Sequence, residues 1–390
     1  QNVGKPISES SGEIAMGADC FQYYAGLLPA FGGQTLPVSA KGTGLTFREP
    51  LGVCALIVPW NFPFAITTWK VAPALAMGNS VVLKPASLTP LTALLLGELA
   101  LEAGLPPGVL NVLPGPGGAV GAALVGHPAV RKIGFTGSTE VGAGIMAQAA
   151  NGIKRVSLEL GGKSASIIFA DADLEQAAGS IWSVFGNAGQ DCCARSRLLV
   201  ERTVYAEVVE RFVERTRAIR LGDPLDPATE LGPLVSAAHR EKVDGYVKRA
   251  VAQGARLCVG GTVPEAAEFA SGSYYLPAVF DNADPSLELV REEIFGPVVA
   301  IIPFEGEAEA VRLANDTIYG LSGSIWTRDI GRALRVARAV ETGVLSINSS
   351  SSVHLSLPFG GFKQSGIGRE LGPGALEHYS EVKSVFIADN

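Results

Sequence analysis

The distribution of apolar residues along the chain predicts strands that alternate with helices. Residues 53–58 and 80–83 are short continuous apolar runs, which are typical of strands buried on both faces of a parallel sheet. Residues 64–77 and 90–103 carry apolar positions at helical spacing, and Gly104 is a natural helix stop. The alternation continues over 109–113, 120–125, 132–135 and 154–160. This order predicts a doubly wound α/β sheet that binds its ligand at the carboxyl ends of the strands.

A second alternation begins after residue 160 and predicts a second α/β domain. The apolar runs that favour strands are 165–169, 198–200, 298–302, 324–326 and 344–347. The segments with helical spacing after residue 160 are 174–185, 204–219, 236–253, 308–315 and 330–340, and residues 7–29, near the start of the chain, also predict a helix. Residues 32–48 alternate weakly and indicate a two-stranded excursion.

Composition narrows the class of protein. A chain of 390 residues with 47% hydrophobic and 18% charged residues fits a two-domain globular enzyme. The net charge of −7 and the scattered lysines and arginines argue against a nucleic-acid partner. Five cysteines without framework spacing favour a reducing compartment, and no apolar run reaches membrane-spanning length. We therefore expect a cytoplasmic protein with no membrane or nucleic-acid partner.

The clearest chemical signal is a cysteine in a polar, flexible loop. Cys192 follows Gly189-Gln190-Asp191, where the glycine lets the backbone bend and approach a ligand closely. Asn187 and Gln190 offer amide donors, so the loop has the equipment of a thiol nucleophile beside an oxyanion site. The alternative is a pair of small apolar cysteines buried under a loop. The polar neighbours favour the nucleophile.

Six short motifs occur in a fixed order along the chain: residues 59–63 (PWNFP), 135–138 (FTGS), 159–163 (ELGGK), 189–195 (GQDCCAR), 293–297 (EIFGP) and 358–361 (PFGG). In sequence, order and approximate spacing they resemble the NAD(P)-dependent aldehyde dehydrogenase superfamily, from about residue 1 to the C-terminus. The amino-/betaine-/semialdehyde dehydrogenase branch is the most similar. The resemblance implies a Rossmann-like cofactor domain, a catalytic domain and oxidation of an aldehyde to a carboxylic acid.

The resemblance also implies roles for three residues. Cys192 is the expected nucleophile, which forms a thiohemiacetal and then a thioester. The side-chain amide of Asn61 and the backbone N–H of Cys192 are expected to hold the oxyanion. Glu159 is the expected base that activates water for hydrolysis of the thioester.

Cofactor contacts are implied at seven positions: Trp60, Lys84, Ser87, Gly117, Ser138, Glu293 and Phe295. Lys84 and Glu293 are expected at the ribose hydroxyls, and Phe295 near the nicotinamide ribose. Ser87 stands where many NAD-specific relatives carry a glutamate that repels a 2′-phosphate. Serine removes that repulsion, so we expect either NAD or NADP, with NADP accepted.

The substrate tunnel is expected to be lined by Phe62, Trp69, Asp191, Cys193 and Val353. Asp191 is a candidate attractor for a cationic amino- or betaine-type aldehyde, and its alternative role is a side chain turned into the loop or to solvent. The serine run at 349–352 lacks aromatic residues, which argues against a quaternary-ammonium cage. A broad-range aliphatic or semialdehyde substrate therefore stays open.

The resemblance divides the chain as follows: a dinucleotide-binding domain at 1–31 and 50–160, a catalytic domain at 161–361, a return segment at 362–378, and an oligomerisation element at 32–49 and 379–390. This element, a hairpin with a C-terminal strand, implies a homodimer or homotetramer. The chain starts at Gln1, at a point that lies inside the family pattern, so we expect a leading segment of the relatives to be missing.

Three other readings compete with an aldehyde dehydrogenase. A thiol esterase or cysteine hydrolase needs a histidine near Cys192, and the local sequence supplies none. CoA-acylating or acyl-phosphate-reducing relatives usually lack the base, so Glu159 argues against them. A catalytically impaired homologue, truncated at its N-terminus, is the third. His127, His239, His354 and His378 are scattered, so we expect no metal site and assign all four to packing or the surface.

Overall fold

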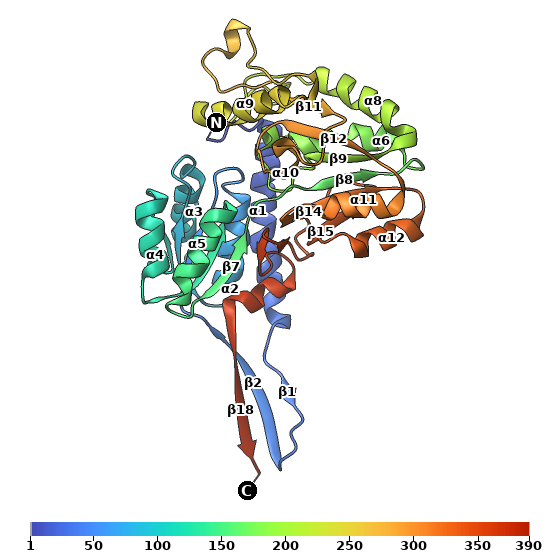
Figure 1. The fold of residues 1–390 in the computed structure, drawn as a ribbon. Coiled ribbons are helices and arrows are strands. Elements are labelled where there is room, and N and C mark those ends of the chain that lie inside the picture. Colours follow the sequence, from blue (N-terminus) through green and yellow to red (C-terminus); the bar gives the residue numbers. More distant parts are fainter. Residues whose placement is uncertain (1, 390) are drawn as a thin grey trace. The chain divides into compact units, whose positions relative to one another are not determined.

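The computed structural model describes residues 2–389, which form two compact units (Figure 1). Unit 1 comprises residues 2–11, 160–353 and 360–366, and unit 2 comprises 12–159, 354–359 and 367–389. Gln1 and Asn390, the outer ends of two predicted domain segments, lie outside the described residues. Besides the strands described below, the chain has two strands of two residues each, β16 (Phe362–Lys363) and β17 (Gly366–Ile367).

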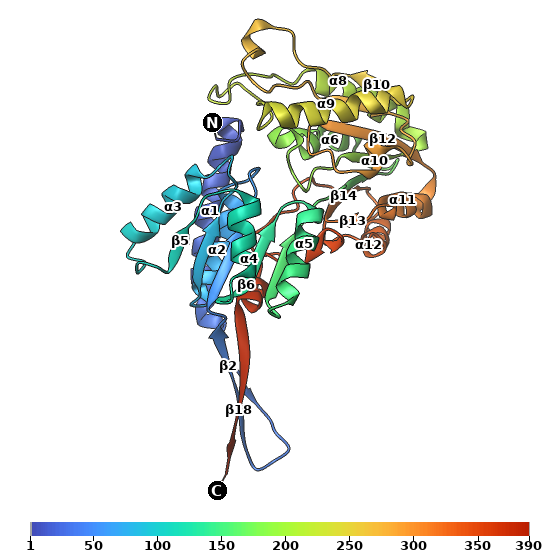
Figure 2. The same cartoon turned by 60° about the vertical axis from the view of Figure 1, so that its left-hand side comes forward.

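Unit 2 contains a parallel sheet with the strand order β7-β6-β3-β4-β5. The strands are β3 (Val53–Ile57), β4 (Ser80–Lys84), β5 (Leu110–Val112), β6 (Val130–Thr136) and β7 (Arg155–Glu159). The helices packed against them are α2 (Ala65–Ala76), α3 (Leu91–Glu102), α4 (Ala122–Gly126) and α5 (Thr139–Ala150) (Figure 2). The predicted alternation of strands and helices is confirmed here.

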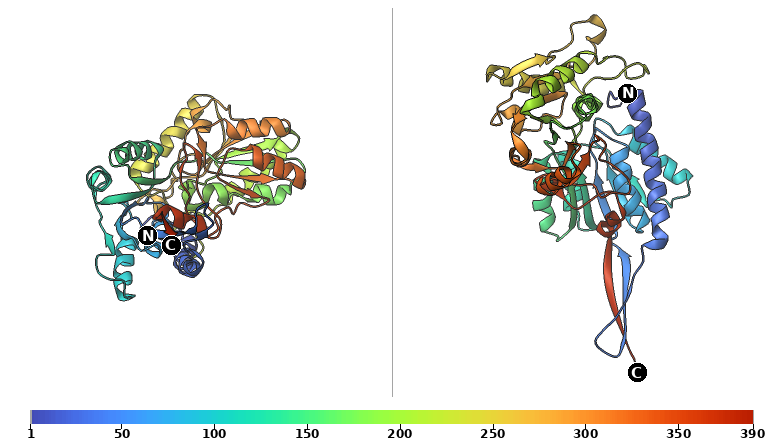
Figure 3. Two further views of the ribbon diagram at one scale, coloured as in Figure 1. Left: turned by 90° about the horizontal axis from the view of Figure 1, so that it is seen from below. Right: turned by 90° about the vertical axis from the view of Figure 1, so that its right-hand side faces the viewer.

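Helix α1 (Ile7–Leu27) runs along unit 2, as the right-hand view of Figure 3 shows for the dark blue helix. Its Glu13 carboxylate accepts hydrogen bonds from the backbone N–H groups of Phe64 (2.8 Å) and Ala65 (3.1 Å). These groups open α2 and have no partner within that helix, so the carboxylate supplies the missing cap and a favourable charge at the positive helix end. Buried Cys20 and Tyr24 complete the contact face.

A buried ion pair joins α2 to the C-terminal part of unit 2. The ammonium group of Lys70 contacts the carboxylate of Glu370, and both side chains are almost fully shielded from solvent. The two residues lie 300 positions apart in the sequence, so the pair forms only in the folded chain.

We expect Glu370→Gln to lower the free energy of unfolding by about 3 kcal/mol or more, because it leaves the Lys70 charge buried without its partner. Urea denaturation followed by far-UV circular dichroism measures the change. The matched control is Glu49→Gln, which breaks the exposed pair of Glu49 with Lys383 and should cost less than about 1 kcal/mol. Equal effects of the two substitutions would contradict the prediction.

A second sheet of unit 2 is a three-stranded antiparallel ribbon that extends away from the rest of the unit (Figures 1 and 2). It consists of β1 (Thr35–Leu36), β2 (Gly42–Pro50) and β18 (Ser380–Ala388). The pairing of β2 with β18 runs over nine residues, from Pro50 opposite Ser380 to Gly42 opposite Ala388. The ribbon exposes large apolar side chains, including Phe47, Val382, Phe386 and Ile387.

Unit 1 contains a seven-stranded sheet with the order β10-β11-β12-β9-β8-β14-β15, parallel except for β10. The strands are β8 (Ala165–Ile168), β9 (Arg197–Glu201), β10 (Arg256–Val259), β11 (Ala278–Asp281), β12 (Val298–Phe304), β14 (Ser322–Trp326) and β15 (Val344–Ile347). The helices are α6 (Leu174–Gly179), α7 (Trp182–Phe185), α8 (Tyr205–Arg217), α9 (Ala237–Ala252), α10 (Glu288–Arg291), α11 (Gly306–Asn315) and α12 (Ile330–Ala339). A short strand, β13 (Tyr319–Gly320), lies outside this sheet.

The sequence pattern misses parts of unit 1. Strands β10 and β11 were not predicted, and the helix expected over 174–185 is broken into α6 and α7 at Ser180–Ile181. Strand β11 is buried along its whole length, but its four residues, three apolar and one aspartate, are too few to show a period. Among the described helices, none combines the length and apolar character that crossing a bilayer requires.

Candidate active site

The loop before Cys192 is a turn of unusual backbone geometry. Asn187, Ala188 and Gly189 are consecutive residues with positive φ, at 49°, 54° and 70°. A Cβ on Gly189 would lie 2.2 Å from the carbonyl oxygen of Gly296, so only glycine fits. Non-glycine residues in this conformation carry strain, and such strain gathers at functional sites.

The amides of Asn187 and Gln190 close this turn. The Asn187 side chain donates to the carbonyl of Gln190 (3.2 Å), and the Gln190 side chain donates to the carbonyl of Asn187 (3.0 Å). The Gln190 side-chain oxygen also accepts the backbone N–H of Val235 at 2.9 Å. Both amides therefore hold the turn that precedes the thiol.

Three segments of unit 1 meet at one edge of its sheet. Gly162 precedes β8, Cys192 precedes β9 and Glu293 precedes β12, and these parallel strands are neighbours. The Glu293 carboxylate accepts the backbone N–H of Gly162 at 2.9 Å. A Cβ on Gly162 would lie 2.3 Å from the carbonyl oxygen of Cys192. Gly162 of the ELGGK motif thus allows the Cys192 backbone to approach closely, and a Cβ on Gly161 would instead lie 2.5 Å from the Glu293 carboxylate.

We expect Gly162→Ala to lower kcat/KM by about 10²-fold, because the new methyl group must displace the backbone of Cys192 by a fraction of an ångström to an ångström. Steady-state kinetics with one aldehyde measures the change. The control is Gly144→Ala in α5, where a Cβ meets nothing within 4 Å. A Gly162→Ala enzyme with unchanged kcat/KM would show that this contact does not position the thiol.

The electrostatics of this edge keep the resting thiol protonated. A hydrogen bond with Cys193, followed by burial and the nearby Asp191 and Glu293 carboxylates, raises the pKa of the Cys192 thiol well above its ordinary value. The residue as a whole keeps partial exposure, although its thiol is surrounded by protein. Burial also raises the pKa of Glu293 to about 7, against the lowering effect of the Gly162 N–H and Lys163.

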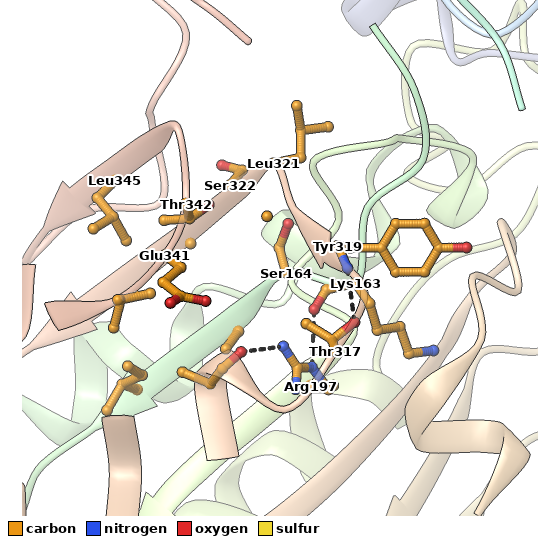
Figure 4. Close-up of a pocket in the computed structure, with 16 residues that line it drawn as sticks. Lys163, Ser164, Arg197, Thr317, Tyr319, Leu321, Ser322, Glu341, Thr342 and Leu345 are labelled. Atoms are coloured by element: carbon orange, nitrogen blue, oxygen red, sulfur yellow. Dashed lines mark hydrogen bonds between the residues drawn. The ribbon is translucent and has the colours of Figure 1, made fainter. Parts of the chain in front are cut away.

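Lys163 ends the glycine turn and is fully buried. Burial, with the neighbouring Arg197 charge, lowers the pKa of Lys163 to about 7. A cavity of about 20 Å³ is lined by Lys163 and by residues of β8, β14 and the segments around residues 314–317 and 340–342, and Figure 4 shows it with Ser164, Arg197 and Thr342 among its lining residues. This volume is enough for a single water molecule. Arg197 donates to the carbonyls of Lys163, Leu313 and Ala314, so the cavity region is structural support and not a substrate site.

In unit 2, candidate residues stand at the carboxyl ends of all five parallel strands. They are Asn61 after β3, Lys84 at the end of β4, Gly117 after β5, Ser138 after β6 and Glu159 at the end of β7. Carboxyl ends of parallel strands share one edge of the sheet, where ligands of doubly wound folds bind. Asn61 and Glu159 are buried, at 2% and 3% exposure.

This edge fits a dinucleotide. Gly117 begins an open turn, and a Cβ there or at Gly118 would meet nothing within 4 Å. The side chain of Lys84 lies against Gly121 of the same turn and donates to the carbonyl of Pro85 at 3.0 Å. Ser138 is the N-cap of α5, where free backbone N–H groups favour a phosphate. Burial lowers the pKa of Lys84 from its usual value.

The remaining predicted residues divide between the two units. Trp60, Phe62 and Trp69 belong to unit 2, and Phe295 and Val353 belong to unit 1. Ser87 is exposed in unit 2 and donates to the carbonyl of Gly115 at 3.0 Å. Asp191 and Cys193 flank the nucleophile, and the Asp191 carboxylate accepts the Cys193 N–H at 2.8 Å.

Glu159 and Cys192 belong to different sheets of the chain. Glu159 ends β7 of the unit 2 sheet, whereas Cys192 precedes β9 of the unit 1 sheet. The chain passes from β7 of unit 2 to β8 of unit 1 over residues 160–164, and helices α6 and α7 follow within unit 1.

Two residues of this region were missed or undervalued in the sequence. Arg195 is buried at 3% exposure and donates to the carbonyls of Cys193 (2.7 Å) and Gly323 (3.3 Å) and to the hydroxyl of Ser352 (2.7 Å). A charged residue three positions after the nucleophile was the available signal. His239, expected to be a packing residue, contacts the carbonyl of Phe295 through its Nε2 atom at 2.7 Å and supports a left-handed Phe295 (φ 60°).

Comparison with known proteins identifies the family. The model of the aldehyde dehydrogenase family matches residues 1–385. A betaine aldehyde dehydrogenase of Bacillus subtilis (strain 168) is 45% identical over 388 residues, which is 99% of this chain and 79% of that protein. No support for a hydrolase or an inactive homologue comes from these relatives.

Solved structures of aldehyde dehydrogenases share the fold of this chain. The betaine aldehyde dehydrogenase of Staphylococcus aureus in complex with NAD+ superposes with a TM-score of 0.97 at 41% identity, over 99% of this chain and 77% of that one. PnpE from Pseudomonas sp. WBC-3 gives a TM-score of 0.97 at 44% identity, over 99% and 80%. The predicted fold class, a Rossmann-like cofactor domain with a second α/β catalytic domain, is confirmed. The chain belongs to the aldehyde dehydrogenase family, and it is an enzyme that oxidises an aldehyde to a carboxylic acid with NAD(P)+ as the hydride acceptor.

Proposed function

We propose that Cys192 carries this oxidation as the nucleophile. The observation that supports it most directly is the turn at residues 187–189, in which three consecutive positive φ angles and a glycine pressed against Gly296 fix the backbone just before the thiol. A buried cysteine that served packing alone would not require such strain.

The reaction that these residues support has two stages. The Cys192 thiol gives up its proton to water, and the thiolate attacks the aldehyde carbon and forms a thiohemiacetal, whose oxyanion is held by the Asn61 amide and the Cys192 N–H. One such donor is worth about 3 kcal/mol of barrier. Loss of hydride leaves a thioester on the sulfur. Glu159 then takes a proton from water, the hydroxide adds to the thioester carbon, and the carboxylic acid leaves as the thiol is regenerated.

The cofactor is NAD or NADP, bound at the carboxyl edge of the unit 2 sheet. Trp60, Lys84, Gly117 and Ser138 line this edge on the proposed assignment, and Glu293 and Phe295 hold the nicotinamide ribose. The open Gly117 turn and the N-terminus of α5 supply backbone donors for the phosphates. When bound, the nicotinamide ring accepts the hydride. The Staphylococcus aureus relative, solved with NAD+, supports NAD as one cofactor.

Ser87 is the proposed determinant of NADP acceptance. We expect Ser87→Glu to lower kcat/KM for NADP+ by about tenfold or more, because the carboxylate repels the 2′-phosphate, while kcat/KM for NAD+ changes little. Initial rates at saturating aldehyde measure both. Ser87→Gln, of nearly the same size but neutral, is the control and should retain NADP+ use. Equal losses for the two cofactors in Ser87→Glu would remove this role.

We propose a cationic amino- or betaine-type aldehyde as the preferred substrate. On this proposal the substrate tunnel is lined by Phe62, Trp69, Asp191, Cys193 and Val353. The half-buried Asp191 carboxylate beside the nucleophile and the names of the Bacillus and Staphylococcus relatives support this class. The test is a panel of betaine aldehyde, an aminoaldehyde, aliphatic aldehydes and a semialdehyde with each cofactor, followed by nicotinamide absorbance. Higher kcat/KM for uncharged or anionic aldehydes would overturn the substrate class but not the reaction.

We further propose that the chain forms a homodimer or homotetramer in the cytoplasm. The β2–β18 ribbon, with its exposed Phe47, Val382, Phe386 and Ile387, is the proposed oligomerisation element. On this assignment residues 1–31 and 50–160 bind the dinucleotide and 161–361 carry the chemistry. Light scattering on the wild type and on Phe386→Lys tests the assembly.

A further inference from the structure

Two thiols and a carboxylate converge at the nucleophile. One oxygen of Asp191 and the sulfur atoms of Cys192 and Cys193 all lie within 4.8 Å of one another, and both cysteines are free. Tetrahedral Zn²⁺ binds cysteine sulfur at about 2.3 Å and carboxylate oxygen at about 2.0–2.2 Å, which places donor atoms about 3.5–3.8 Å apart. The cluster therefore needs only small side-chain rotations to surround such an ion. Our expectation of no metal site considered only the histidines.

The ligand atoms are available and reachable. One Asp191 oxygen accepts the N–H of Cys193 at 2.8 Å, which fixes the carboxylate beside the thiols and leaves its second oxygen for a metal. This is the carboxylate orientation that a hydrogen-bonded ligand shell requires. Asp191 and Cys192 are partly exposed, so an ion can enter, and Cys193 is buried behind them.

The surrounding charge favours an occupied cluster. Two thiolates and one carboxylate around Zn²⁺ carry one net negative charge. The buried Arg195 guanidinium donates to the carbonyl of Cys193 at 2.7 Å, and within the described chain no carboxylate forms an ion pair with it. Buried charges are normally paired, so a negative cluster two residues away supplies the compensation that Arg195 lacks.

We propose that Asp191, Cys192 and Cys193 form an inhibitory Zn²⁺ site, with a water molecule as the fourth ligand. Binding replaces the two thiol protons, which pass to solvent, and involves no change of oxidation state. The loss of activity rests on the proposed role of Cys192 as nucleophile, whereas binding itself does not.

Cobalt(II) is the direct probe, because thiolate ligands give it an intense charge-transfer band and tetrahedral geometry gives it characteristic visible bands. We expect one equivalent to produce both in the wild type. Cys192→Ser and Cys193→Ser should each weaken binding by about 100-fold or more, and Asp191→Asn by about tenfold. The matched control is Cys258→Ser, which should keep the full spectrum. A spectrum that survives Cys193→Ser, or that is lost in Cys258→Ser, would overturn the site.

A measurement on the wild type alone avoids any variant that fails to fold. One equivalent of Zn²⁺ should protect both Cys192 and Cys193 from iodoacetamide, as read by peptide mass spectrometry, while labelling of Cys258 continues. EDTA should restore both labelling and aldehyde oxidation. Protection of neither thiol, or of only one, would overturn the proposal. Protection of both thiols with full activity would leave the metal site standing and refute both the inhibition and the nucleophile assignment.

Discussion

Replacing Cys192 with serine is expected to lower kcat/KM for aldehyde oxidation by about 10⁴-fold or more. A serine hydroxyl at this position has no adjacent histidine, and the neighbouring Asp191 and Glu293 charges oppose its ionisation. Loss of an enzyme nucleophile typically costs about 10⁴- to 10⁶-fold. Rapid-mixing kinetics should show no burst of reduced nicotinamide, because no thiohemiacetal forms.

The controls for this variant separate chemistry from folding. Cys258 lies in β10 and not in the loop that carries Cys192, so Cys258→Ser should retain the wild-type rate. Cys193→Ser should keep a burst, since it removes a neighbour of the nucleophile and not the nucleophile itself. NAD+ binding to Cys192→Ser, followed by tryptophan fluorescence, should be preserved. Oxidation by Cys192→Ser at a rate near that of the wild type would exclude the thiol mechanism.

The resting thiol of Cys192 is protonated and must be activated before it attacks. Its pKa lies well above the ordinary value, so at neutral pH the thiol is protonated, and the reactive thiolate fraction grows as pH rises toward that pKa. Nucleophiles of this kind need an activating partner at the moment of attack. An Arg195 guanidinium bound to the Cys193 carbonyl contributes positive charge to the same loop and favours the thiolate.

Sequence patterns predict the parts of this enzyme that depend on local or short-range chemistry. The apolar runs of unit 2 become β3, β4 and β6, because a strand buried on both faces must be continuously apolar. Ser138 caps α5, and Gly162 and Gly189 occupy places that a side chain would block. Such features depend on a few consecutive residues, so the local sequence is enough to predict them.

Features that depend on long-range packing are not predicted. Lys70 meets Glu370 from 300 positions away, and neither residue stands in a motif that requires the other. The groups that accept hydrogen bonds from Arg195, two backbone carbonyls and the Ser352 hydroxyl, come from three different segments. Asn187 and Gln190 offered amide donors in the sequence, and only the folded loop shows that each side chain donates to the backbone carbonyl of the other residue.

Glu159→Gln gives the second large effect, and it falls on a different step. We expect a burst of reduced nicotinamide close to one equivalent per active site, followed by steady-state turnover slower by about 10²- to 10⁴-fold, the usual contribution of a general base. The amide keeps the size of the carboxylate but cannot take a proton from water, so the thioester on Cys192 accumulates. Stopped-flow absorbance measures the burst and the slow phase, and mass spectrometry of the quenched enzyme detects the acyl group.

The position of Glu159 makes this substitution a clean test of base catalysis. The residue is 3% exposed at the end of β7, where its backbone carbonyl accepts the N–H of Gly137 at 3.1 Å, so a glutamine keeps the strand end intact. The exposed Glu98→Gln in α3 is the control for a carboxylate-to-amide change without a catalytic role. Hydroxylamine, which attacks thioesters without a base, should speed turnover of Glu159→Gln selectively. A Glu159→Gln enzyme with neither burst nor hydroxylamine rescue would place Glu159 before acylation, and unchanged turnover would remove it from the mechanism altogether.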